Sequence, residues 1–203
     1  MAKKTKTRQG ERAAARRDDR SDRYDDSAYE DLRYSITYSM DELQFSRAAS
    51  LVAPSWLYNV GMGIAFVGLV AIILLLVSNP DNLVPALVCM AVSLIGTYIT
   101  GNWSSVVMRM AAGSTLALTG TDNHRHVVIT DTELTELGPD DRKATYPLSD
   151  LKKVHADDDA CVLDFGSKRY VYAPKSAMSE NRFRALVREA RERTGQPQDD
   201  KAA

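Results

Sequence analysis

The sequence has few of the residues that most enzyme and metal sites use. It contains two cysteines and three histidines among 203 residues. Cys89 and Cys161 lie in parts of the chain of different character and neither has a metal-type neighbour, so we interpret both as small buried hydrophobic residues. The sequence has no glycine-rich phosphate loop, nucleophile elbow or zinc motif. We therefore expect no catalytic residue, no cofactor and no small-molecule substrate.

An excess of charge of either sign is also lacking. The chain has 26 basic and 27 acidic residues and a formal charge of −1, so no global field attracts nucleic acid, and we do not expect nucleic-acid binding. The first 30 residues contain no apolar core of the signal-peptide type. We expect the first long apolar run to serve as the insertion signal instead.

Charged side chains are absent from two long stretches, from Ala48 to Pro80 and from Asn82 to Met108. Residues 55–77 would form a helix about 34 Å long, against a hydrocarbon core of about 30 Å. Residues 83–103 supply a second apolar stretch of sufficient length. A soluble helix keeps a polar stripe, because a chain of 203 residues cannot cover two helices that are apolar all round. The sequence therefore predicts two transmembrane helices rather than a soluble hairpin.

Residues 78–82 (SNPDN) allow only a tight turn, so the two spans should form an antiparallel hairpin. The turn lacks Lys and Arg, whereas Arg33, Arg47, Arg109 and Arg125 flank the other ends of the spans. Positive charge near span ends stays cytoplasmic, so we expect an external turn and two cytoplasmic termini. Four aromatic residues should form a belt at the cytoplasmic membrane interface: Trp56, Tyr58, Tyr98 and Trp103.

Small residues recur at helical spacing on one face of each span. Such faces let helix backbones approach closely in lipid. We expect them to pack the two spans against each other within one chain; contact between two copies in a homo-oligomer is the alternative. The predicted packing residues are Gly61, Ala65 and Gly68 on the first span and Cys89, Ser93 and Gly96 on the second.

The residues before the spans divide into two segments. Residues 1–31 have a basic block followed by an acidic block and little apolar surface, so we predict a disordered cytoplasmic tail. Residues 32–54 should form a strand over 32–39, where apolar and polar residues alternate, and a juxtamembrane helix. Ser39 and Glu42 have the spacing of a capping box at the start of that helix.

The residues after the spans predict a small β domain. Residues 102–113 fit either a continuation of the second span or an interfacial segment, and both remain open. Residues 114–195 contain short apolar segments separated by Gly, Asp and Asn, which predict an antiparallel meander closed by one amphipathic helix. That helix should begin after Ser179, end at Gly195, and bury Phe183, Leu186, Val187 and Ala190. We predict a disordered tail over 196–203. The expected strands are 114–119, 126–130, 133–137, 143–147, 151–155, 161–165 and 168–174.

The predicted fold class is an α+β membrane protein. Short antiparallel strands closed by a C-terminal helix resemble a pleckstrin-homology-like (PH-like) module. The order ITYSMDELQFSRAAS, a two-span hairpin, VVITDTELTEL, TYPLSDLKKV and YVYAPKSAMSENRFRALVREA is more narrowly similar to the YcxB-like family of bacterial membrane proteins, over about Leu32 to Thr194. The resemblance implies a cytoplasmic β domain at the bacterial plasma membrane and no established activity. If strand 32–39 pairs with strands after the hairpin, the spans are an insertion into this domain.

Few residues qualify as candidates for chemistry. His124 and His126 resemble half a metal site, but no ligand set completes it, and we interpret them as solvated loop residues. His155 beside the acidic turn Asp157–Asp159 could act as a base with an orienting acid, although no nucleophile accompanies it. A candidate basic patch for lipid headgroups or a protein partner comprises Lys152, Lys153, Lys168, Arg169 and Lys175; ordinary solvated strand charge is the alternative.

Three functions remain open. The preferred one is a membrane-anchored cytoplasmic interaction or regulatory module that binds a partner protein, a lipid headgroup or its own copy. A small membrane enzyme based on His155 is the second. A pore or transporter component is the third, and it is disfavoured because the spans lack Asp, Glu, Lys, Arg and His, which ion pathways usually retain.

Overall fold

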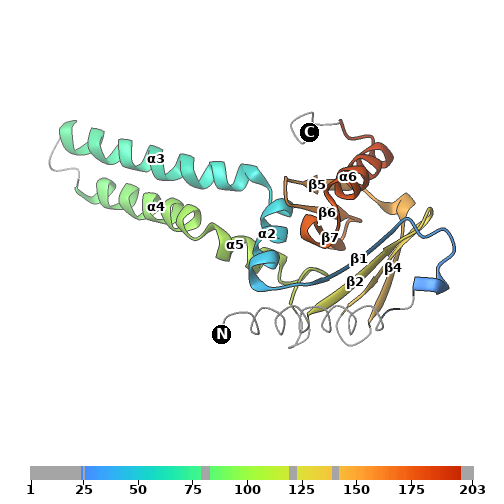
Figure 1. Ribbon diagram of the computed structural model, residues 1–203. Coiled ribbons are helices and arrows are strands. Elements are labelled where there is room, and N and C mark those ends of the chain that lie inside the picture. The colour runs from blue at the N-terminus through green and yellow to red at the C-terminus, as the bar shows by residue number, and fades with distance from the viewer. Residues whose placement is uncertain (1–23, 25, 79–82, 119–122, 139–141, 198–203) are drawn as a thin grey trace, which may run out of the picture.

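The computed structural model describes residue 24 and residues 26–78, 83–118, 123–138 and 142–197 (Figure 1). The predicted external turn lies outside this part of the chain except for Ser78. Most of the two predicted tails also lies outside it. The fold is α+β, with a helical hairpin projecting from two antiparallel sheets.

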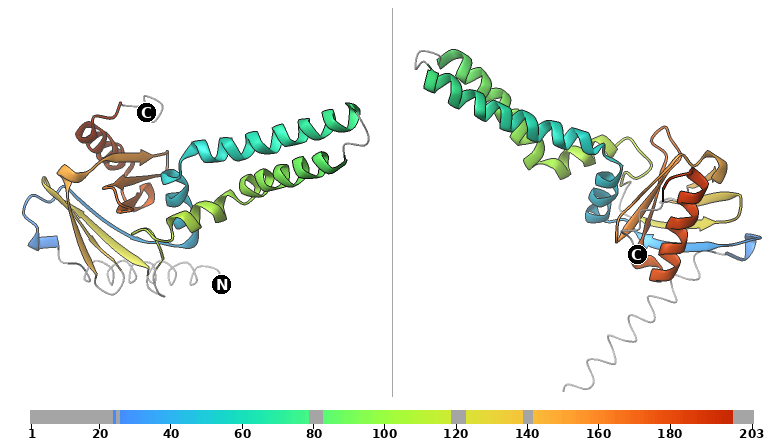
Figure 2. Two further views of the ribbon diagram at one scale, coloured as in Figure 1. Left: turned by 180° about the vertical axis from the view of Figure 1, so that it is seen from behind. Right: turned by 90° about the horizontal axis from the view of Figure 1, so that it is seen from above.

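The hairpin consists of α3 (Ser55–Ser78) and α4 (Leu83–Gly101), which lie side by side in both views (Figures 1 and 2). The prediction for the second span ran to residue 103, but α4 ends at Gly101. A separate helix, α5 (Trp103–Ala111), follows. The break falls at Asn102, whose φ of −110° and ψ of 29° are not helical and whose Nδ2 donates to the Tyr98 carbonyl at 3.1 Å.

The outer surfaces of α3 and α4 are not covered by protein. Only 11% of the most apolar window of each helix is buried. The fully buried positions are Gly61 and Gly68 on α3 and Ala86 and Gly96 on α4. Both helices are long and apolar enough to cross a membrane. A soluble core helix of this composition would be mostly buried, so these two helices require an apolar environment of another kind.

The strands form two sheets rather than the single meander predicted. Leu148–Asp150 forms a 3₁₀ turn after β4, and burial of Leu148 and Leu151 turns the chain into the second sheet. The four-stranded sheet A has the order β1-β2-β3-β4, and the three-stranded sheet B has the order β5-β6-β7. The strands are β1 (Tyr34–Ser39), β2 (His124–Ile129), β3 (Glu133–Leu137), β4 (Lys143–Pro147), β5 (Lys153–Ala156), β6 (Ala160–Asp164) and β7 (Tyr170–Pro174).

Strand β1 pairs with β2, although both membrane-length helices lie between them in the sequence. Tyr34 is opposite Ile129 and Ser39 is opposite His124 in an antiparallel register. Figure 1 shows β1 running beside β2 from the far end of sheet A to the base of the hairpin. The helices α2 to α5 are therefore an insertion between two neighbouring strands, which the sequence left as a hypothesis.

We call α2 (Glu42–Val52), α5 and residues 112–118 the neck. Figure 1 shows α2 across the base of the hairpin and α5 between the hairpin and the sheets. The buried faces of both neck helices belong to the same core as the strands; Phe45 and Ala48 contribute from α2 and Val107 from α5. Ser46 and Ser104 join the two helices through a 2.7 Å hydrogen bond. The hairpin is thus fixed to the β domain by packing.

Two local predictions were wrong. The cap of α2 is Asp41, whose carboxylate accepts from the Gln44 N–H at 2.7 Å, while Ser39 ends β1. Residues 114–118 form turns instead of a strand. The Thr115 N–H donates to the Lys168 carbonyl at 3.2 Å, and the hydroxyl of Thr115 donates to the Tyr170 carbonyl at 2.6 Å. These hydrogen bonds attach the segment to β7 and the residues before it, but they are not the regular hydrogen bonds of paired β-strands.

The C-terminal helix α6 (Glu180–Thr194) packs on sheet B. Its buried residues are the four expected from the apolar spacing: Phe183, Leu186, Val187 and Ala190. Ser179 occupies the N-cap position but makes no side-chain cap bond. Gly195 ends the helix with a φ of 66°, a left-handed conformation that favours glycine.

Candidate functional site

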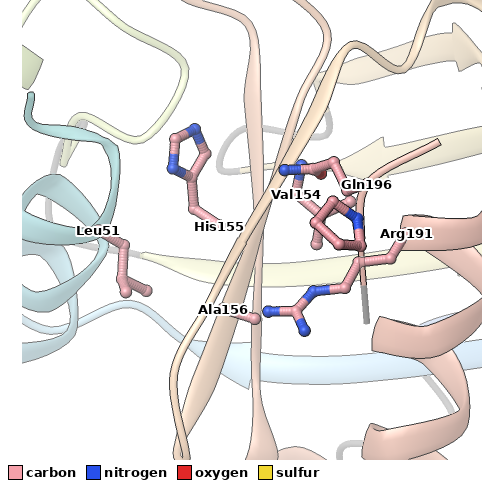
Figure 3. Close-up of a pocket in the computed structure, with 7 residues that line it drawn as sticks. Leu51, Val154, His155, Ala156, Arg191 and Gln196 are labelled. Carbon is pink, nitrogen blue, oxygen red and sulfur yellow. The ribbon is translucent and has the colours of Figure 1, made fainter. Parts of the chain in front are cut away.

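A cavity of about 270 Å³ lies along strand β5, between α2 and the end of α6 (Figure 3). Its walls come from three separate parts of the chain. They are Leu51 from the last turn of α2, Val154, His155 and Ala156 from β5, Arg191 from α6, and Gln196 and Pro197 after it. Leu51 precedes the start of α3 by four residues, so the cavity lies near the base of the hairpin.

Strand β5 is an edge strand, and a side chain takes the place of a neighbouring strand there. The Val154 N–H donates to Oε1 of Gln196 at 2.7 Å. Thr194 donates from its hydroxyl to the same oxygen at 3.0 Å. The left-handed Gly195 turns the chain back towards β5, which places Gln196 there. Residue 196, which the prediction placed in a disordered tail, is therefore anchored to β5, while residues 198–203 of that predicted tail lie outside the described part of the chain.

His155 is half-buried beside this cavity. Burial lowers its pKa, Lys153 lowers it further, and Asp164 opposes the shift. The side chain is therefore neutral at pH 7. The sequence allowed His155 to pair with an acid of the turn Asp157–Asp159, but two of these acids bond elsewhere: the Asp157 carboxylate accepts from the Asp159 and Ala160 N–H groups, and Asp159 pairs with Arg47 of α2 at 2.6 Å. Asp157 therefore stabilises the turn between β5 and β6, and Asp159 joins this turn to α2 of the neck.

The polar groups that line the cavity come from β5, from α6 and from the residues after α6. The cavity offers a guanidinium from Arg191, a neutral imidazole from His155 and the amide of Gln196, and none of its lining residues is a Ser, Thr or Cys nucleophile. Across the part of the chain that the structure describes, no group of three or more His, Cys, Asp or Glu side chains could hold a metal ion.

The residues of the predicted basic patch lie at three places. Lys152, Lys168 and Arg169 gather at the β6–β7 turn, where Arg169 donates to the carbonyls of Gly166 and Phe165. Lys175 lies at the other end of β7, with its Nζ 3.4 Å from the Glu180 carboxylate. Lys153 is on β5 opposite Asp164. The five residues do not form one surface.

His126 is buried in strand β2, which contradicts its interpretation as a solvated loop residue. Its ring stacks on Tyr24 with centroids 4.3 Å apart. Nε2 lies 2.8 Å from the Asp26 carboxylate and Nδ1 lies 2.7 Å from the Thr37 hydroxyl. Tyr24 and Asp26 were expected in the disordered tail; His126 holds them on the outer face of sheet A instead. His124 occupies the first position of the same strand.

The sequence interpretation missed a buried ion pair between β2 and β3. Arg125 and Glu136 are 3% and 4% exposed, and their side chains meet at 2.9 Å. Arg125 also donates to the carbonyls of Thr115, Leu116 and Ala117, which belong to the neck. Burial raises the pKa of Glu136, and Arg125 opposes that shift. We call this arrangement the Arg125 clamp.

The predicted helix-packing residues face each other between α3 and α4. A Cβ on Gly68 would lie 2.8 Å from the Ser93 Cβ, and one on Gly96 would lie 2.6 Å from the Gly61 carbonyl oxygen. Ser93 donates to the Ala65 carbonyl at 2.9 Å. Cys89 is partly buried on the same side, and Cys161 is fully buried in β6, where burial raises its pKa to about 12.

The four predicted belt residues lie at the neck end of the hairpin. Tyr58 and Trp103 meet edge to face with centroids 5.4 Å apart. Trp56 and Tyr98 are each 61% exposed. At this end of the hairpin, two of the aromatic rings therefore join α3 to α5, and the other two are exposed on the outside.

Comparison of the chain with protein-family models, with curated proteins and with solved structures found no match.

Proposed function

We propose that the chain is a membrane-anchored cytoplasmic interaction or regulatory module, which binds a partner protein or a lipid headgroup. The observation that carries this proposal is the position of the hairpin. Two exposed apolar helices of membrane length project from neck helices that share the core of the β domain. Such helices have their lowest free energy when they are inserted in lipid. A domain joined to them without a flexible linker would be held against the membrane surface.

The orientation that we propose has the turn outside and both termini in the cytoplasm of a bacterium. Arg33 and Arg47 lie on the domain side of α3, and Arg109 and Arg125 lie on the domain side of α4. Positive charge at this side of a hairpin favours its retention in the cytoplasm. The aromatic residues at the neck end would then lie in the headgroup region of the inner leaflet.

We further propose that the β domain is PH-like and that the chain is a YcxB-like protein. Two antiparallel sheets of four and three strands followed by a helix on the second sheet support this proposal. The placement of β1 before the hairpin and of the remaining strands after it matches the order that carries the resemblance.

A membrane-extraction and topology experiment tests the anchoring. The full chain should remain in the membrane pellet after alkaline carbonate washing, and a reporter fused after Ala203 should be active only in its cytoplasmic form. Release of the intact chain by carbonate, or a reporter active outside the cytoplasm, would contradict the proposal. Crosslinking and mass spectrometry in native membranes then identify what the domain contacts.

A small membrane enzyme is the second candidate, and one observation favours it: the neutral His155 borders a polar cavity. Replacing His155 with Ala distinguishes the two functions. An interaction module should keep its crosslinked partners and its cellular phenotype in this variant. Loss of the phenotype in a variant that is still folded, inserted and able to retain its partners would favour the enzyme.

A further inference from the structure

The β6–β7 turn is fixed against the neck. Besides the two hydrogen bonds of Thr115 to Lys168 and Tyr170, the Tyr170 N–H donates to the Thr115 hydroxyl at 2.7 Å. The amine of Lys168 lies 3.6 Å from the position that a Cβ on Gly113 would occupy. Gly113 follows the end of α5, which Figure 1 shows between the hairpin and the sheets. The turn therefore lies against the segment of the neck that follows α5.

Three cations surround this turn, and we call Lys152, Lys168 and Arg169 the basic turn. The Lys152 side chain lies against Gly166, with its Nζ 2.7 Å from the position of an added Cβ. Arg169 binds the Gly166 and Phe165 carbonyls through Nε and Nη2, at 3.3 and 3.0 Å. Two acids lie close to these cations in the sequence: Asp164, whose carboxylate accepts from the Gly166 N–H, and Asp150, two residues before Lys152. Positive charge therefore predominates at the basic turn.

The backbone of the turn is held in an uncommon shape. Gly166, Ser167 and Lys168 have φ values of 78°, 53° and 62°, which are all left-handed. Ser and Lys rarely adopt this conformation, and it persists only where the surroundings determine it. Here the Lys168 carbonyl accepts from the Thr115 N–H of the neck. The neck thereby sets the direction in which the basic turn faces.

We propose that the basic turn binds the phosphate groups of anionic lipids in the inner leaflet. This inference rests on the proposed anchoring and names the ligand of the module. Each basic residue close to an anionic membrane raises the equilibrium constant for contact with the membrane roughly fivefold. Three such residues acting together should therefore hold the domain against the leaflet. The contact should weaken as salt screens it. The lipid in question is any bilayer lipid with a net negative headgroup.

Fluorescence quenching in lipid nanodiscs tests this proposal. The full chain carries Cys89→Ala and Ser167→Cys, with a fluorophore at position 167; the buried thiol of Cys161 should not react, since its pKa is raised to about 12. A nitroxide-labelled headgroup lipid serves as the quencher. Quenching should be strong in nanodiscs that contain phosphatidylglycerol, weak in pure phosphatidylcholine, and reduced by high salt.

A matched pair of variants separates the basic turn from net charge. Lys152→Gln with Lys168→Gln should reduce quenching in phosphatidylglycerol to the phosphatidylcholine level. Arg182→Gln with Arg193→Gln removes the same charge and should leave quenching unchanged. Arg193 donates to the carbonyl of Asp131 beyond β2, which runs away from the neck, so this second pair lies at the far end of the domain.

The outcomes are distinguishable. If the chain does not co-elute with the nanodisc, the anchoring proposal fails and this inference fails with it. If the chain inserts but quenching is the same in both lipids, or equal in the two variant pairs, only the basic-turn inference is overturned. A photo-crosslinker at position 167 that captures a protein instead of lipid in native membranes would also overturn it and assign the turn to a protein partner.

Discussion

At the residue scale, the Arg125 clamp is the most demanding electrostatic feature of the molecule. Glu136 is 4% exposed, and Nη1 and Nη2 of Arg125 make four hydrogen bonds, to one carboxylate and to three carbonyls of the neck. Nε of Arg125 and the hydroxyl of Tyr38 are buried without a protein partner. A buried ion pair of this kind adds little net stability, but it is costly to break. Its position indicates a role in fixing the neck to sheet A.

Replacing Arg125 with Met should destabilise the protein by about 3 to 5 kcal/mol, because Glu136 would remain buried and charged without a partner. Thermal unfolding of the detergent-solubilised chain measures the loss as a lower Tm. The double variant Arg125→Met with Glu136→Leu removes both charges and should recover most of it. Equal Tm values for the single and double variants would contradict this account.

The second prediction at this scale concerns pH. The folded pKa of His155 is lowered, so the unfolded chain binds more protons than the folded one as the pH falls through about 6.5. The contribution of this residue to stability is present above that pH and is lost as the pH falls through the folded pKa. Tm should therefore decrease on acidification from about pH 7.5 to about pH 5.5.

A His155→Gln variant provides the control, because glutamine keeps a hydrogen-bonding side chain but does not titrate. Its Tm should fall less over the same pH interval than that of the parent chain. If both chains lose the same amount of stability, the pH dependence arises from other groups and the assignment to His155 is wrong.

At the scale of elements, the α3–α4 contact depends on glycine at the points of closest approach. A side chain at position 96 would meet the carbonyl oxygen of Gly61 at 2.6 Å and the N of Ala65 at 2.7 Å, and neither backbone atom can yield without moving a helix. Gly63 on α3 has nothing within 4 Å of the same position. The hairpin thus contains a glycine at a point of close helix contact, Gly96 on α4, and one in open space, Gly63 on α3.

Gly96→Val should therefore destabilise the hairpin by about 1 to 3 kcal/mol, as overpacked contacts do, while Gly63→Val should have little effect on it. The measurement is the Tm of each variant in the same detergent. Equal losses would show that the valine acts through helix propensity instead of through the contact between α3 and α4.

The sequence predicted the elements well where a single period dominates. The limits of α3, β3, β4 and α6 agree with the apolar spacing to within a residue or so, because burial of one face requires that spacing. It failed where tertiary contacts outweigh local pattern. Residues 114–118 have the composition of a strand. However, Arg125 binds the carbonyls of residues 115–117, and the Thr115 hydroxyl accepts from the Tyr170 N–H, so the segment is held by these contacts instead of by a β-ladder.

The candidate site was less accessible to prediction for the same reason. His155 could be singled out, but Arg191 and Gln196 reach the cavity only because α6 lies on sheet B and Gly195 reverses the chain. Arg125 could have been found: it alternates with Val127 and Ile129 and so shares their inward face, but the predicted strand began one residue too late. Nothing in the sequence around Lys152 predicts that its side chain lies at the β6–β7 turn.

At the scale of the whole molecule, sheet A is completed by residues from both sides of the hairpin in sequence. Ser39→Cys with His124→Cys should form a disulfide, since the two residues are directly opposite across β1 and β2 and opposite Cα atoms lie about 4.5 to 5.5 Å apart. Electrophoresis without reductant detects the closed loop. Ser39→Cys with Thr145→Cys, on the edge strand β4, is the control and should not close.

A disulfide in the control at the same rate as in the test pair would contradict the strand order. Absence of a bond in the Ser39 and His124 pair, in a chain that is still folded and inserted, would contradict the pairing of β1 with β2. Either result would also remove the argument that the helical segment is an insertion into the β domain.

The pairing of β1 with β2 imposes an order on biogenesis. Residues 34–39 leave the ribosome first, yet their ladder partners at 124–129 follow only after both apolar helices have been synthesised. Sheet A therefore cannot close until the two apolar helices have been synthesised. Until then β1 has an open edge, which is a hazard for aggregation. A nascent chain stalled before His124 should therefore depend on chaperones more than the finished protein does.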